Sequence, residues 1–110
     1  MISFDVMVEK VANYDELLCS TEAHFNVDFN KYSEEYADGF NYENKYIVTA
    51  SPTKISFLMS DSNIIPNLIS EINSFLLDNF QNQLVGIRCK GKEDLLQSDF
   101  FPGIKTKIIL

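Results

Sequence analysis

The sequence has little of the material from which catalytic and cofactor sites are built. It contains one histidine, two cysteines, four glycines and no tryptophan in 110 residues. It has no CxxC pair, HExxH motif, EF-hand pattern or glycine-rich phosphate loop, so we expect no metal site and no cofactor. A serine or cysteine nucleophile would need His24 as its base, and no nucleophile motif accompanies that residue. The sequence therefore favours a function other than catalysis.

Long apolar runs are also missing. No stretch approaches the roughly 20 apolar residues that span a bilayer, and the N-terminus lacks the basic flank and apolar run of a signal peptide. We therefore expect a protein without membrane contact that works in the cytoplasm. Cys19 and Cys89 lie far apart, and cytosolic proteins usually keep such thiols reduced, so we expect two buried free thiols. The sequence leaves a disulfide between them open.

Basic residues are scarce in the first part of the chain. Residues 1–43 hold ten acidic residues against Lys10 and Lys31, a net charge of −8, whereas residues 44–110 carry a net charge of +1. A phosphate backbone needs Lys and Arg to neutralise it, so we expect no direct contact with nucleic acid. A basic partner is favoured, although acids that only keep a small protein soluble would give the same composition.

Apolar patterning predicts a single globular domain over residues 1–110. Period-two alternation indicates strands, and apolar positions three and four apart indicate helices. The predicted elements, in chain order, are a strand at Ile2–Val8, a helix from Asn13 to about Phe25, a hairpin of Lys45–Ala50 and Lys54–Ser60, a core helix from Ile65 to Phe80, a strand at Leu84–Cys89, a helical turn at 93–97 and a strand at Ile104–Leu110.

The segment from Asp28 to Asn44, DFNKYSEEYADGFNYEN, concentrates acidic and aromatic residues. Asn30 can cap a short helix and Gly39 can end it, so we predict an acidic helix in which Lys31 pairs with Glu35. The fold class is then α+β, with a single, mainly antiparallel sheet of about five strands covered by two main helices, plus the short acidic helix. This is a ferredoxin-like or related sandwich.

Acidic groups interleaved with tyrosines suit a surface that steers a cationic protein towards aromatic contact residues. The stretch SEEYADGFNYEN (residues 33–44), on a small acidic domain, resembles the acidic, tyrosine-bearing surfaces of bacterial immunity proteins, including those of contact-dependent growth inhibition systems. The resemblance covers that segment and the overall size and charge. It implies a protein inhibitor that neutralises a basic toxin or a nucleic-acid-processing enzyme such as a nuclease. The residues expected to bind the partner are Lys31, Glu34, Glu35, Tyr36, Asp38, Tyr42 and Glu43.

Other readings of the same residues stay open. The acids can be a solvated face over an aromatic core stripe. The chain can instead be a small ligand-binding or regulatory module that forms a homodimer, with Lys105 and Lys107 on the pairing edge. A small enzyme would have to depend on His24, or on Asp38 and Glu43 with Lys45.

Overall fold

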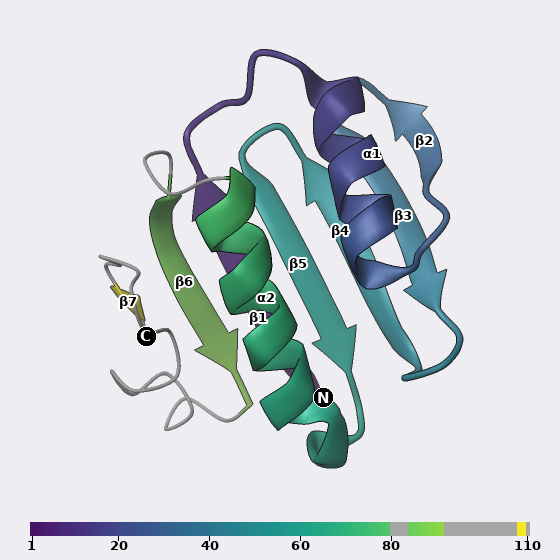
Figure 1. Ribbon diagram of the computed structural model, residues 1–110, viewed down its shortest axis with the longest axis vertical. Coiled ribbons are helices and arrows are strands. Elements are labelled where there is room, and N and C mark those ends of the chain that lie inside the picture. The colour runs from purple at the N-terminus through teal and green to yellow at the C-terminus, as the bar shows by residue number, and fades with distance from the viewer. Residues whose placement is uncertain (80–83, 92–107, 110) are drawn as a thin grey trace.

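The computed structural model describes residues 1–79, 84–91 and 108–109, and in them the strands form one sheet in the order β2-β3-β4-β5-β1-β6-β7 (Figure 1). Every neighbouring pair is antiparallel except β6 with β7, which is parallel. The α+β fold class is therefore confirmed. The elements are β1 (Ile2–Val8), α1 (Tyr14–Phe25), β2 (Asn30–Ser33), β3 (Tyr36–Asn41), β4 (Tyr46–Ser51), β5 (Lys54–Met59), the 3-10 turn η1 (Ser62–Ile64), α2 (Ile65–Asn79), β6 (Leu84–Lys90) and β7 (Ile108–Ile109).

The central part of the fold has the β-α-β-β-α-β order of the ferredoxin-like motif, in β1, α1, β4, β5, α2 and β6. The hairpin of β2 and β3 is inserted between α1 and β4 and extends the sheet beyond β4. The prediction of about five strands was too low because it placed a helix where this inserted hairpin adds two strands. The predicted C-terminal strand is represented among the described residues by β7, which pairs with β6.

The predicted acidic helix at residues 30–39 was wrong, because this segment forms β2 and β3. Tyr36, Asp38 and Phe40 alternate with the buried Ala37, Gly39 and Asn41, which is the period-two pattern of a half-buried strand. The spacing of Tyr32, Tyr36 and Phe40 is four residues, so it satisfies a helix and a strand equally. Packing of the small alternate positions beneath α1 favours the strand.

Both helices lie on the same side of the sheet (Figure 1). The core forms between them and the strands, from alternate positions such as Phe4, Val48, Phe57 and Ile87. Asn13 caps α1 as predicted, since its side chain accepts a hydrogen bond from the Glu16 amide at 3.1 Å. The opposite side of the sheet carries no helix of the described residues.

The helix α2 bears out the apolar stripe expected for the main core helix. Leu68, Ile72, Phe75 and Leu76 are buried on its inner face. The Phe75 ring lies 5.2 Å from the Phe25 ring, which fixes α2 against α1. Among the described residues, no helix is long and apolar enough to cross a bilayer.

The two cysteines differ in environment. Both are free thiols, but Cys19 is exposed on α1 and only Cys89 is buried, so the expectation of two buried thiols was half wrong. The predicted helical turn at 93–97, and the predicted edge lysines Lys105 and Lys107, lie outside the described residues.

Candidate partner-binding surfaces

The residues predicted to bind a partner lie on the hairpin of β2 and β3 and in the turn from β3 to β4, spread over three places. The turn holds Glu34 and Glu35, and the Glu35 amide donates to the Ser33 hydroxyl at 3.1 Å. A β-strand rises about 3.3 Å per residue, so the six residues of β3 separate this turn from the one at the far end by about 20 Å. The seven residues do not form one compact site.

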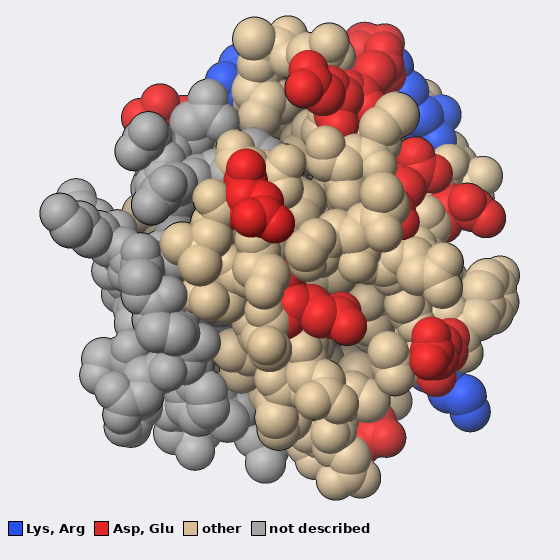
Figure 2. All heavy atoms as spheres, viewed as in Figure 1, with Lys and Arg blue, Asp and Glu red and all other residues tan. Residues whose placement is uncertain are grey.

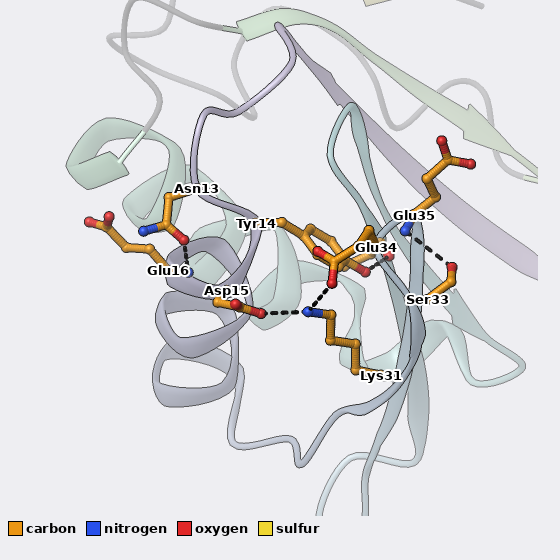
Figure 3. A network of polar contacts seen from close by, with 9 residues as sticks. Asn13, Tyr14, Asp15, Glu16, Lys31, Ser33, Glu34 and Glu35 are labelled. Atoms are coloured by element: carbon orange, nitrogen blue, oxygen red, sulfur yellow. Dashed lines mark hydrogen bonds and ion pairs between the residues drawn. The ribbon is translucent and has the colours of Figure 1, made fainter.

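Lys31 forms ion pairs with two acidic residues of the same chain (Figure 3). Its Nζ atom lies 2.9 Å from the Asp15 carboxylate on α1 and 2.9 Å from the Glu34 carboxylate in the hairpin turn. The predicted pairing with Glu35 was wrong, because Glu35 points away from Lys31. The hydrogen bonds that its ammonium group donates to the Glu34 and Asp15 carboxylates raise the pKa of Lys31, since they stabilise its charged form. Lys31 therefore ties the hairpin to α1.

Tyr14 contacts this network through the face of its ring, over which the Lys31 ammonium lies. Its hydroxyl donates to the Ala50 carbonyl at 2.9 Å, and the Lys31 ammonium lies 5.6 Å from the centre of its ring. Burial raises the pKa of Tyr14, and the charge of Lys31 partly offsets that effect. Tyr14 therefore stays neutral at physiological pH and fixes the position of the ammonium group.

Four exposed acidic residues at the start of α1 and in the hairpin turn form what we call the acidic rim: Asp15, Glu16, Glu34 and Glu35. A depression of about 270 Å³ lies beside it, lined by Lys10, Val11, Ala12, Tyr14, Glu34, Glu35 and Pro52. With Lys31 and Lys10 counted, the rim region keeps a net charge of −2. All four acidic side chains are exposed, and two of them, Glu16 and Glu35, have no basic partner among the described residues.

Tyr36 and Asp38 lie on the sheet face that the helices leave uncovered. The Tyr36 ring is 5.8 Å from the Tyr32 ring. The negative charge of Asp38 and a hydrogen bond to it raise the pKa of Tyr32, together with partial desolvation. Sequence reasoning left Tyr32 out of the site, although its position two residues before the turn places it beside Tyr36.

Tyr42 and Glu43 lie in the turn after β3, at the far end of the hairpin. The rings of Phe40 and Tyr42 meet edge to face at 4.8 Å. They line a depression of about 390 Å³ together with Asp28, Asn30, Asp38, Gly39 and Ile47. It opens where β2 stops short, because β2 pairs only with residues 36–38 of β3.

The two helices carry acidic residues and no lysine or arginine of their own, although Lys31 of the hairpin pairs with Asp15. α1 contains Asp15, Glu16 and Glu22, and α2 contains Glu71 and Asp78. Figure 2 shows acidic groups spread over this helix-covered face, with basic groups only at its margin. The acidic surface extends from the rim across the helices, which reasoning from residues 28–44 alone did not indicate.

The alternative of an enzyme rested on His24, or on Asp38 and Glu43 with Lys45. His24 packs against the Phe25 and Phe75 rings, and its Nε2 atom is 2.9 Å from the Glu71 carbonyl. It therefore links α1 to α2. Within the described ranges, no three His, Cys, Asp or Glu side chains gather so that they could hold a metal ion.

No protein-family model matches the chain, and it shows no significant similarity to a curated protein or to a solved structure.

Proposed function

We propose that the protein is an inhibitor that binds a basic protein and blocks its action, in the manner of an immunity protein that neutralises a nuclease toxin in the cytoplasm. The observation that carries this proposal is the acidic face: α1 and α2 present five acidic residues and no lysine or arginine. The acidic rim adjoins α1 and adds Glu34 and Glu35.

Electrostatics gives this surface a role in association. A cationic cleft that binds nucleic acid attracts an acidic surface, and complementary charge raises the rate of encounter. Lys31 lies beside the rim, but its positive charge is already paired with the carboxylates of Asp15 and Glu34. We therefore assign Lys31 to holding the hairpin in place, and the contacts with the partner to the acids around it.

The aromatic residues first expected to contact the partner lie elsewhere. Tyr36 follows Glu35 but lies on the uncovered sheet face, and Tyr42 is in the far turn. The proposal consequently depends on the rim and the helices. It requires no catalytic residue in this chain.

The test is capture of partners from the source cells by the tagged protein, at low and at high salt, with identification by mass spectrometry. We expect a basic partner that high salt releases. Glu16→Lys with Glu35→Lys should abolish capture, because both carboxylates are exposed and neither side chain makes a contact that holds the fold. The corresponding glutamine pair should weaken capture less.

A matched control separates a local surface from overall charge. Asp28→Lys with Glu43→Lys changes the net charge by the same amount, at exposed positions away from the rim. This pair should keep most of the capture. Equal loss in both pairs would mean that only total charge matters, and undiminished capture by the rim pair would refute the proposal.

A further inference from the structure

Within residues 1–79, 84–91 and 108–109, no helix covers one face of the sheet. The strand pairing places three rows of side chains on this open face, from β6 across to β2. The open face comprises Ser3, Asp5, Met7, Asn30, Tyr32, Tyr36, Asp38, Phe40, Ile47, Thr49, Ser51, Lys54, Ser56, Leu58, Arg88 and Lys90. All of them except Asp5 are at least partly exposed.

Apolar side chains are prominent on this face. Tyr32, Tyr36 and Ile47 are 65%, 46% and 38% exposed, which is high for residues of their size. Ile47 stands directly across from Leu58 on β5 and from Phe40 on β3, so the three form one continuous strip. Burial of such a strip against a second surface would be favourable.

The charges of the open face separate into two halves. Lys54, Arg88 and Lys90 lie on β5 and β6, where the buried Asp5 accepts a hydrogen bond from Ser56 at 2.8 Å. At the other side of the face Asp38 is the charged group. Asp28 lies close to it, because both residues line the depression beside Phe40 and Tyr42. One half is therefore positive and the other negative.

Arg88 indicates that the positive half is incomplete in the isolated chain. Its Nε atom is buried without a partner, and within the described residues its only hydrogen-bond contact is from Nη2 to the sulfur of Met7 at 3.7 Å. A buried donor without an acceptor is costly, and because Nε is closed to solvent, a carboxylate of a second copy would bind the partly exposed Arg88 through its other guanidinium nitrogens.

We propose that a second copy of this chain covers the open face, with the two sheets packed face to face about a two-fold axis that runs along the strands. A two-fold axis in this direction lays the β2–β3 side of one copy over the β1–β6 side of the other. The negative half of each copy then meets the positive half of its partner, and the apolar strips meet near the middle. The contact is isologous and therefore closes as a dimer.

The size of the face suits this arrangement. Six strands about 4.8 Å apart and about 20 Å long give a footprint of roughly 500 Å², and corrugation by side chains increases the accessible area towards the roughly 800 Å² per partner of a standard interface. Packed sheets lie about 10 Å apart, which these side chains can fill. Both helix-covered faces point outward in the dimer, so each copy keeps its acidic face for a partner.

The test uses two charge reversals, Asp38→Lys and Lys90→Glu, with masses measured by sedimentation equilibrium at low salt. The wild-type protein should have about twice the 12.6 kDa mass of the chain. Each variant alone places its introduced charge against a half of the same sign, so its dimerisation should weaken about tenfold or more. An equimolar mixture of the two variants should dimerise again. In the mixed dimer the introduced lysine and the introduced glutamate lie on opposed halves, and so do the unchanged Lys90 of one variant and Asp38 of the other.

The restoration on mixing separates this interface from a change in folding, which mixing cannot repair. Ile47→Asp should also give a monomer, whereas Ala23→Asp on the exposed side of α1 should leave the dimer intact. Three results would each overturn the proposal: a monomeric wild-type protein at about 200 µM, dimers that survive both reversals, or a mixture that stays monomeric although both variants have wild-type circular dichroism.

Discussion

The side-chain amide of Asn41 donates a 2.6 Å hydrogen bond to the carbonyl of Phe25, and so ties the end of β3 to the last turn of α1. The Asn41 Oδ1 atom also accepts a bond from the Asn44 amide at 2.8 Å. Asn41 is 3% exposed, so water cannot replace either bond. One side chain thus joins the inserted hairpin, the helix and the next turn.

Replacing Asn41 with alanine should lower the free energy of unfolding by about 1–3 kcal/mol, because the Phe25 carbonyl and the partly buried Asn44 amide each lose a hydrogen-bond partner. Urea unfolding at pH 7 measures this. Asn30→Ala is the control, since Asn30 is exposed on β2 and such changes usually stay within about 0.5 kcal/mol. Similar values for both variants would show that the Asn41 bonds contribute little.

Gly39 permits the close approach of another part of the chain. A Cβ atom at this position would lie 2.7 Å from the Asp28 carbonyl oxygen, which belongs to the backbone and cannot rotate away. We expect Gly39→Ala to destabilise the protein by about 1–3 kcal/mol, as overpacking does. The same unfolding experiment tests this, and an unchanged or raised stability would mean that the segment before β2 moves aside freely.

Periodicity in the sequence predicted the secondary structure correctly where the spacing of the apolar residues fitted only a helix or only a strand. The stripe that includes Leu68, Ile72 and Phe75 predicted α2, and the polar break at Ser51–Thr53 predicted the β4–β5 hairpin. The segment at 30–41 failed because aromatic residues four apart fit both periods, and because the small residues that pack beneath α1 carry little pattern of their own.

The candidate surface depended on contacts that no local pattern reveals. The bond from Lys31 to Asp15 joins positions sixteen residues apart, and it exists only because the hairpin lies beside the start of α1. Net charge correctly indicated an acidic N-terminal part, but the concentration of acids on the helix-covered face follows from the sheet having both helices on one side. Grouping residues by sequence proximity therefore put Tyr42 with Glu34, although β3 separates them.

Phe75 tests the packing between the two helices. Its ring is 1% exposed and contacts the rings of Phe25 and His24, at centroid distances of 5.2 Å in both cases. Phe75→Ala should cost about 3–5 kcal/mol through the cavity that it leaves. Phe75→Leu keeps most of the volume and should cost clearly less. Equal losses for the two variants would show that the ring contacts, rather than the cavity, determine stability here.

Tyr46 should make the protein sensitive to alkaline conditions. Its side chain is 1% exposed, and burial raises its pKa well above the usual value, with a smaller effect from the charge of Glu71. Below about pH 10 the folded and unfolded states both hold the proton, so Tyr46 adds no pH dependence. Above that pH only the unfolded state loses it, and stability falls by about 1.4 kcal/mol per pH unit for each such group.

Tyr14 and Lys31 also have raised pKa values and act in the same direction, so the wild-type slope above pH 10 combines several groups. Above pH 10, Tyr46→Phe should make the fall of the free energy of unfolding with pH less steep by about 1.4 kcal/mol per pH unit, the contribution of one proton. Between pH 7 and 9 the free energies of the two proteins should change with pH in parallel. Guanidinium unfolding at intervals of half a pH unit measures both ranges. Because phenylalanine cannot ionise, an unchanged slope above pH 10 would mean that Tyr46 reaches solvent and ionises in the folded state.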